Sequence, residues 1–317
     1  MVKSLVSIII PIFNRFELAH QTIQSVYKQT HRPIELILVD DCSDMPYKPQ
    51  INSEPGFEVI LLRHAENKGP GASRETGRQA ATGDFIAYLD SDDLWHPEKL
   101  EKQVATLREN PNTGMCYCTS LEFSKWPLCG KEKIRKRSDQ AYREFLPTVL
   151  SGRPWGTGAC LWTKDAIDKI GPWLSSFAWE DSEYECRAGC KDIQITSISE
   201  VLSYYRKNSG QKQLSGKLTY RQMNTWIISI TQMMKNLKYF GKLDNQDVRL
   251  AFSKKVFRHV PPLFEANQKK LGLEALSVLF HSSSGIRKLL FFSLNSAGHV
   301  LSSTTLKRLC YKMRNYI

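Results

Sequence analysis

The chain lacks several features that would define its class at once. No run approaches the roughly 18 consecutive apolar residues that cross a bilayer, and the most apolar stretch of the last third covers only residues 289–292. The eight cysteines contain no CxxC pair and no zinc-like spacing, so we interpret them as reduced thiols of a cytosolic protein. No Ser–His–Asp or Cys–His arrangement is evident, so a covalent nucleophile is not expected. Residues 1–4 lead directly into an apolar run, and a signal peptide is not expected either.

Acidic residues are scarce in the last third of the chain. Residues 1–216 carry 27 Lys and Arg against 28 Asp and Glu, whereas residues 217–317 carry 17 against 4. Residues 286–292 and 306–314 combine these cations with Phe or Leu, a pattern typical of helices that bind an anionic membrane surface. A helical subdomain with a solvated basic face is the alternative. Nucleic acid is not an expected partner, because no nucleic-acid-binding motif is present.

Short apolar runs alternate with amphipathic segments over the first 122 residues. The runs predict buried strands, and they lie at residues 6–11, 34–39, 57–62, 85–89 and 115–118. Helices are expected between them, the first from Asn14 with Glu17 in a capping-box variant, the next at 71–81, and another opened by Pro97. This alternation predicts an α/β domain with a doubly wound, mostly parallel sheet flanked by helices.

Carboxylates follow two of the predicted strands at the point where each ends. Asp40 and Asp41 close the second strand, and Asp90, Asp92 and Asp93 close the fourth. The carboxyl ends of parallel strands share one edge of a sheet, which is where open α/β sheets bind ligands. The first pair can accept hydrogen bonds from a base or a ribose. The second group would repel itself unless a cation lies among its members, and a divalent cation bridging to phosphates is the expected partner.

Between these two acidic groups lies a glycine-bearing, basic segment, Asn67-Lys68-Gly69-Pro70-Gly71-Ala72-Ser73-Arg74. It opens a predicted helix, and the N-terminus of a helix favours anions. The segment matches neither the Walker A pattern nor GxGxxG. Together with the two acidic groups it predicts a site for a nucleoside diphosphate.

Five motifs, in order and in spacing, resemble the family 2 inverting glycosyltransferases of GT-A fold. They occupy residues 7–14 (SIIIPIFN), 39–44 (VDDCSD), 67–69 (NKG), 89–93 (LDSDD) and 179–183 (WEDSE), with Arg187 six residues after Asp181. The resemblance covers residues 4–210 and implies a GT-A domain at 1–213. Residues 1–122 would form its nucleotide-sugar-binding half and 147–213 its acceptor and catalytic half. Residues 214–317 would form a mainly α-helical, basic extension.

The resemblance assigns donor-binding roles to residues of the first four motifs and the helix that follows the third. Pro11 and Phe13 would line the nucleobase pocket, and Asp41 would accept the uracil N–H. Arg74 would lie near the base or the diphosphate. Ser91 would lie beside the nucleotide sugar.

It also assigns the residues of the reaction itself. Asp90 would face the ribose, and Asp92 would ligate Mg²⁺ or Mn²⁺. Asp181 matches the catalytic base, with Glu180 as its neighbour. Asn208 stands where the family often has a histidine, so Lys207 or Lys212 is an alternative source of positive charge there.

Three other residues carry weaker expectations. Trp155 falls where the family builds its acceptor site, and it would either stack on a sugar or pack in the core. His64 and His96 are expected to be ordinary surface or edge residues without a catalytic role.

The predicted function is metal-dependent, inverting transfer of a sugar from a nucleotide sugar, with a UDP-sugar expected. The acceptor would be a hydroxyl of a saccharide or lipid-linked molecule, as in the synthesis of surface polysaccharide or glycolipid. The predicted location is the cytoplasm, with peripheral attachment to the inner face of the membrane if residues 217–317 bind lipid. The alternatives are a nucleotidyltransferase of similar topology and a non-catalytic nucleotide-sugar-binding protein.

Overall fold

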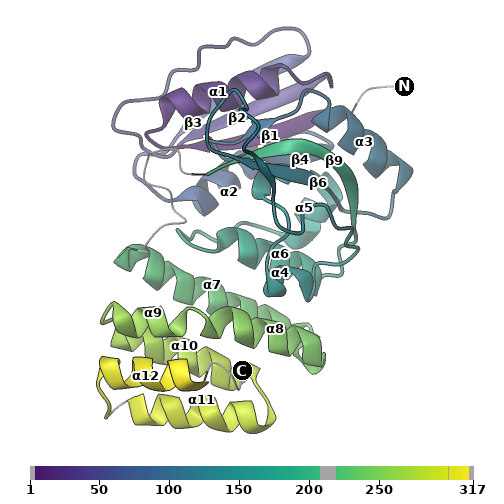
Figure 1. The fold of residues 1–317 in the computed structure, drawn as a ribbon. Helices are drawn as coiled ribbons and strands as arrows, with labels where there is room; N and C mark the ends of the chain where they lie inside the picture. Colours follow the sequence, from purple (N-terminus) through teal and green to yellow (C-terminus); the bar gives the residue numbers. More distant parts are fainter. Residues whose placement is uncertain (1–3, 208–218, 299, 314–317) are drawn as a thin grey trace. The chain divides into compact units, whose positions relative to one another are not determined.

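The computed structural model describes residues 4–207, 219–298 and 300–313 (Figure 1). The chain divides into two compact units. The first consists of Met1–Phe145, Pro154–Ser175 and Asp192–Gly216, and the second of Leu146–Arg153, Ser176–Lys191 and Lys217–Ile317. Two short segments of the predicted catalytic half therefore cluster with the C-terminal helices. The functional division into 1–122, 147–213 and 214–317 stays a prediction.

The first unit is built on a nine-stranded sheet in the order β3-β2-β1-β4-β8-β6-β9-β5, with β7 paired to β6. Its strands are β1 (Val6–Ile12), β2 (Ile34–Asp40), β3 (Phe57–Arg63), β4 (Phe85–Tyr88), β5 (Leu94–Trp95), β6 (Met115–Phe123), β7 (Lys133–Ile134), β8 (Cys160–Thr163) and β9 (Ile195–Arg206). The strands β3-β2-β1-β4 are parallel, and Figure 1 shows β1, β2 and β3 side by side. Beyond β4 the sheet is mixed, because β8 runs antiparallel to both β4 and β6.

Two of the parallel strands, β1 and β2, are buried on both faces, as their apolar sequences predict. Every residue of β2 is buried, and β1 has a single half-buried residue. The helices of this unit are α1 (Phe16–Tyr27), α2 (Pro70–Ala80), α3 (Lys99–Glu109), α5 (Lys164–Ile170) and the short 3₁₀ turn η1 (Thr157–Ala159). The register pairs Ile12 with Asp40, so the ends of β1 and β2 meet at one edge, as predicted.

The start of α1 differs from its prediction. Its N-cap is Arg15, which makes no side-chain capping bond, and Asn14 lies outside the helix with a φ of 54°. The Asn14 side chain donates to Asp44 Oδ2 at 3.0 Å and accepts from the Asp44 N–H at 2.8 Å. This long-range pairing uses the side chain that a capping box would have needed, so the predicted capping box is wrong.

The second unit is helical throughout the part that the structure describes. Its elements are α4 (Thr148–Ser151), α6 (Glu180–Cys190), α7 (Tyr220–Tyr239), η2 (Lys242–Asp244), α8 (Gln246–Phe257), α9 (Val260–Glu265), α10 (Lys269–Ser282), α11 (Gly285–Gly298) and α12 (Ser303–Met313). A capping box between Thr219 and Gln222 begins α7, and that helix buries Trp226, Ile230 and Met233. In the described segments, no helix combines the length and the apolar composition that a bilayer crossing needs.

Candidate active site

Three carboxylates gather directly after β4, and we call Asp90, Asp92 and Asp93 the acid cluster. Asp93 is buried, and its Oδ1 accepts from the backbone N–H of Arg206 at 2.8 Å. Asp92 Oδ2 accepts from Arg15 Nη1 at 2.9 Å, and Arg206 Nε donates to the Asp92 carbonyl at 2.7 Å. The end of β9 and the start of α1 thus hold the cluster in place.

Negative charge is concentrated in the acid cluster. Burial raises the pKa of Asp92, and the charge of Asp90 raises it further, against the opposing effects of Arg15 and Arg206. Burial also holds the pKa of Asp93 well above its usual range, with Asp92 and Asp90 adding to the shift. A cation bound here would relieve this repulsion.

Arg74 joins the helix α2 to the acid cluster. Its Nη2 donates to Asp90 Oδ1 at 2.7 Å, while its guanidinium lies 5.0 Å from the centre of the Trp173 ring. Arg74 is buried, whereas the Asp90 side chain is 35% exposed. The pair therefore presents one charged edge to solvent at the carboxyl end of β4, and it unites two of the predicted donor-binding residues.

The Asp41 side chain accepts hydrogen bonds from the backbone just before α2. Its Oδ1 accepts from the Lys68 N–H at 2.9 Å and its Oδ2 from the Gly69 N–H at 2.7 Å. Gly69 has a φ of 90°, a conformation that favours glycine, and it caps the helix that Pro70 begins. Each carboxylate oxygen has two acceptor positions, so Asp41 can still accept a further N–H.

His64 is a residue of this site that the sequence reasoning missed. Its side chain is buried, with Nδ1 2.7 Å from Asp41 Oδ1 and Nε2 2.9 Å from Thr76 Oγ1. The expectation of an ordinary surface or edge residue is therefore wrong. The available signal was its place directly after the third predicted strand, at the same sheet edge as Asp41.

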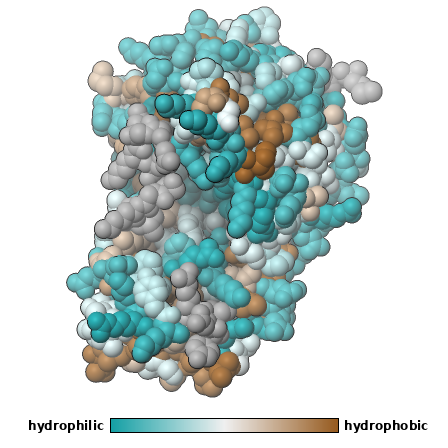
Figure 2. Space-filling view, viewed as in Figure 1, coloured by the Kyte–Doolittle hydropathy of each residue, from teal (hydrophilic) through white to brown (hydrophobic). Residues whose placement is uncertain are grey.

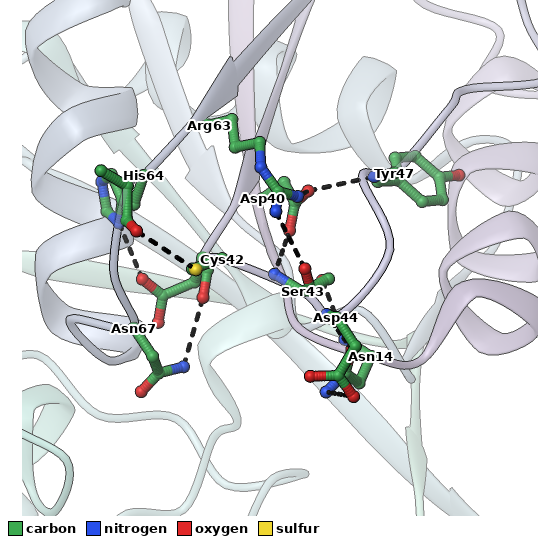
Figure 3. Close-up of polar contacts among 11 residues, drawn as sticks. Asn14, Asp40, Cys42, Ser43, Asp44, Tyr47, Arg63, His64 and Asn67 are labelled. Atoms are coloured by element: carbon green, nitrogen blue, oxygen red, sulfur yellow. Dashed lines mark hydrogen bonds and ion pairs between the residues drawn. The ribbon is translucent and has the colours of Figure 1, made fainter.

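Asp40 shapes the loop beside this site rather than offering a free carboxylate (Figure 3). Its oxygens accept from the N–H groups of Ser43 at 2.9 Å and Tyr47 at 3.0 Å, and Arg63 pairs with it. Burial alone would raise the pKa of Asp40, but these hydrogen bonds lower it overall. The loop fixed in this way carries Asp41 at its start.

The remaining predicted donor residues lie on neighbouring elements. Pro11 is half-buried near the end of β1, and Phe13 follows the strand with 44% of its surface exposed. Ser91 is buried in the turn of the acid cluster. The Ile12 carbonyl accepts from the Asp41 N–H at 2.8 Å, which ties the end of β1 to the loop after β2.

The acid cluster fits a divalent ion by the chemistry of its donors. Within the described ranges, no group of three or more His, Cys, Asp or Glu side chains is arranged so that it could hold a metal ion. Mg²⁺ in nucleotide sites is held by one or two carboxylates together with phosphate oxygens, so a complete protein cage is not required. Asp92 can supply such an oxygen, and both causes of its raised pKa, burial and then the charge of Asp90, disfavour an uncompensated negative charge and so favour a cation.

In the second unit, Asp181 lies in the first turn of α6. Its Oδ1 accepts from the Ser182 N–H at 2.6 Å, and Arg153 pairs with its other oxygen. The same arginine holds Glu185 through two hydrogen bonds of 2.6 Å, from Nε and Nη2. Arg153 is a second residue that sequence reasoning missed, since nothing in the sequence links it to a motif 28 positions away. Glu180, the predicted neighbour of the base, is buried.

Behind Asp181 lies a half-buried lysine from α8. Lys255 Nζ donates to the Val149 carbonyl at 3.2 Å and lies 4.6 Å from the centre of the Trp179 ring. Burial lowers the pKa of Lys255 to about 8, with Asp181 opposing the shift. The pKa of His259, whose ring lies 4.7 Å from that of Trp179, falls to about 4 because of burial and the charge of Lys255.

The other residues named from the sequence have these positions. Trp155 is fully buried and packs on Tyr117, with ring centres 4.6 Å apart, which confirms the core alternative. Lys207 Nζ pairs with Glu122 at 2.5 Å. Asn208 and Lys212 lie outside the described residues.

Comparison with known proteins identifies the family. The family model described as "Glycosyl transferase family 2" matches residues 7–167, which is half of the chain. The chain belongs to glycosyl transferase family 2. The predicted family is thus confirmed, and the match includes Pro11, Asp41, Arg74 and the acid cluster.

Two relatives of this family 2 member have informative names. The putative teichuronic acid biosynthesis glycosyltransferase TuaG of Bacillus subtilis is 36% identical over 71% of this chain and 71% of its own length. The UDP-Glc:alpha-D-GlcNAc-diphosphoundecaprenol beta-1,3-glucosyltransferase WfgD of Escherichia coli is 38% identical over 64% of this chain and 77% of its own. The chain spans only 17% and 38% of the length of two other relatives.

A solved structure confirms the fold class. The crystal structure of S. aureus TarS 1–349 in complex with UDP-GlcNAc matches with a TM-score of 0.73, covering 98% of this chain and 92% of that one. Sequence identity is 14%, so this likeness concerns the fold alone. It extends over the helical C-terminal region of this family 2 member as well as the sheet.

Proposed function

We propose that this protein transfers a sugar from a nucleoside diphosphate sugar to a hydroxyl of a saccharide or lipid-linked acceptor. The observation that carries the proposal is the acid cluster at the end of β4, where burial and then the charge of Asp90 raise the pKa of Asp92, and where the buried Arg74 pairs with Asp90. A divalent metal ion bound to a diphosphate would supply the positive charge that such a cluster of carboxylates needs. The names of WfgD and TuaG support a lipid-linked or polysaccharide acceptor, and UDP is the expected nucleotide.

In this proposal the first unit binds the donor. Asp41 accepts the N–H of the base, and Pro11 and Phe13 line the base pocket. Asp90 and Ser91 lie against the ribose side, with Arg74 holding Asp90 in place. Asp92 would hold Mg²⁺ or Mn²⁺, and the ion would supply a positive charge that stabilises the departing diphosphate.

Asp181 accepts the proton of the acceptor hydroxyl as that oxygen attacks the anomeric carbon. The bond between this carbon and the diphosphate oxygen breaks, and the nucleoside diphosphate leaves with the electron pair. One displacement with a single base inverts the anomeric centre, and no covalent enzyme intermediate is needed. Arg153 holds Asp181 in its rotamer, and Glu180 lies beside it in the first turn of α6.

A thermal-shift panel tests the donor proposal. Nucleotide sugars are compared with and without Mn²⁺, using wild type and Asp92→Asn. A ligand at about 100-fold excess over its dissociation constant adds roughly 2.7 kcal/mol, so a UDP-sugar should raise Tm by several degrees in wild type with Mn²⁺. The absence of a shift with every nucleotide sugar would contradict the proposal. Release of pyrophosphate instead of a nucleoside diphosphate during turnover would favour the nucleotidyltransferase alternative.

Peripheral membrane association on the cytoplasmic side completes the proposal, and α11 is the element that supports it. Its outer face exposes Ile286, Leu289 and Phe292, which are 73%, 66% and 55% exposed. Their spacing of three residues puts them on one side of the helix. Figure 2 shows hydrophobic residues gathered at the lower end of the view, where the C-terminal helices lie. No Asp or Glu follows Glu274 in the sequence, so anionic lipid meets no repelling carboxylate there.

Vesicle sedimentation tests this part of the proposal separately. Wild type should sediment with phosphatidylglycerol-containing vesicles at low salt, and less at high salt. Leu289→Ser should weaken sedimentation, because burying a leucine in the interface stabilises binding by roughly 1.5–3 kcal/mol. Ile228→Ser on α7, also at an exposed position, is the matched control. Equal binding of both variants, or none by wild type, would remove the membrane from the proposal.

A further inference from the structure

The guanidinium of Arg135 has a buried donor that no described residue accepts. This donor is Nε, which lies without a hydrogen-bond partner in that part of the chain. Buried polar groups nearly always have partners, so an exception calls for an explanation. A ligand that is absent from the protein alone is one such explanation.

Hydrogen bonds hold the backbone around Arg135. Arg135 directly follows β7, and its N–H donates to the Ser120 carbonyl of β6 at 2.8 Å. The buried Ser138 returns a hydrogen bond of 2.9 Å from its Oγ to the Arg135 carbonyl. These bonds hold the Arg135 backbone, and with it the Cα from which the side chain extends, next to β6.

The side chain extends over an aromatic ring beside the acid cluster. Its guanidinium lies 4.7 Å from the centre of the Tyr205 ring, and Tyr205 directly precedes Arg206, whose backbone N–H binds Asp93. A guanidinium stacked on a ring keeps its N–H edge available, and that edge matches phosphate oxygens.

The segment predicted to serve the acceptor passes between these groups. A Cβ on Gly156 would lie 3.8 Å from Tyr205 Cδ2, and a Cβ on Gly158 would lie 3.9 Å from Asp93 Oδ2. Gly156 and Gly158, with the buried Thr157 between them, thus bring the backbone of this segment close to the Tyr205 ring and to Asp93, and a Cβ on Gly158 would also meet Leu89 Cδ1 at 2.9 Å. Arg135 follows β7, which pairs with β6, and it borders the same region through its contact with the Tyr205 ring.

We infer that Arg135 binds a phosphate oxygen of a diphosphate group at the edge of the acid cluster. The diphosphate belongs either to the nucleotide donor or to a lipid-linked acceptor, and both present the same chemistry to the guanidinium. The inference rests on the proposed function, since it needs a diphosphate substrate at the acid cluster. It adds a binding residue from a segment outside the five sequence motifs.

The test compares Arg135→Gln with Arg137→Gln. Arg137 lies in the same segment and also faces a tyrosine ring, but its Nε already donates to Tyr142 Oη at 2.9 Å. Both variants lose one positive charge. Isothermal titration measures the binding of UDP, uridine and a short-chain alkyl diphosphate N-acetylglucosamine, each with Mn²⁺. Arg135→Lys keeps the positive charge but lacks the planar guanidinium. Circular dichroism checks that every variant folds.

Arg135→Gln should weaken UDP binding by about 10- to 100-fold, the effect of one hydrogen bond to a charged group. Uridine should bind as in wild type, and Arg137→Gln should change neither. If only the alkyl diphosphate loses affinity, the diphosphate is that of the acceptor. Unchanged binding of both diphosphates, or equal loss of UDP and uridine, would overturn the inference. Failure of wild type to bind UDP and uridine would overturn the proposed function itself.

Discussion

The half-buried lysine behind Asp181 makes a quantitative prediction about stability and pH. Lys255 has its pKa lowered from 10.5 to about 8 by burial. Below about pH 8, the side chain is protonated in both the folded and the unfolded chain, and the folded state carries the penalty of the buried charge. Between the two pKa values the folded chain releases its proton first. The unfolded chain then binds more protons, so stability rises with pH across this window.

The size of this rise follows from the shift. One pKa unit corresponds to about 1.4 kcal/mol, so the free energy of unfolding should rise by roughly 3 kcal/mol over the whole window between the two pKa values. Between about pH 7 and pH 10 it should rise by roughly 2 kcal/mol. Solvent reaches part of the side chain, which makes these figures upper values. Lys255→Met removes the titrating group, so the free energy of unfolding of wild type should rise relative to this variant by about 2 kcal/mol over that interval.

Urea denaturation followed by far-ultraviolet circular dichroism measures this difference at both pH values. Lys254→Met is the matched control, because Lys254 is the exposed neighbour on the same helix and its loss removes the same charge. Wild type and the control should change together with pH. The reasoning is refuted if wild type and Lys255→Met keep a constant difference, or if wild type loses stability relative to the variant as the pH rises.

Two further predictions concern the loop beside the proposed donor site. His64→Ala should weaken uridine binding about tenfold, because Asp41 loses its Nδ1 partner; isothermal titration would disprove this by finding the affinity unchanged. Asp40→Asn should lower the free energy of unfolding by about 2–3 kcal/mol at neutral pH, since the hydrogen bonds from Ser43 and Tyr47 favour the charged carboxylate. The lowered pKa of Asp40 means that this stability is present above its ordinary pKa and is lost as the pH falls through the folded value. Denaturation in acid should therefore bring wild type and Asp40→Asn together, and a gap that persists there would contradict the assignment.

The parallel half of the sheet was predictable because its signals are local in the sequence. The strands β1, β2 and β4 are mostly apolar runs, with Asp40 and Asp41 at the end of β2 and the acid cluster after β4. The strands beyond β4 carry no such signal of direction. The antiparallel insertion of β8 between β4 and β6 depends on pairing between segments more than 40 residues apart.

The partners of the site residues were less predictable than the residues themselves. Asp90 and Asp181 stand out as motif acids, but the arginines that hold them, Arg74 and Arg153, are chosen by tertiary packing. Asn14 is a residue type that often occupies the N-cap, yet its side chain hydrogen-bonds to Asp44 and it lies outside the helix. In each case a long-range contact outweighs the local preference.

The central claim divides the work between Asp92, which holds the metal-bound donor, and Asp181, which takes the proton. The direct measurement is the affinity for UDP with and without Mn²⁺, alongside sugar transfer, for Asp92→Asn and Asp181→Asn. The account predicts that Asp92→Asn loses the Mn²⁺-dependent part of UDP affinity. It predicts that Asp181→Asn keeps that affinity while transfer falls by about 10²- to 10⁴-fold, the usual effect of losing a general base. Undiminished transfer by Asp181→Asn, or full Mn²⁺-dependent binding by Asp92→Asn, would contradict it.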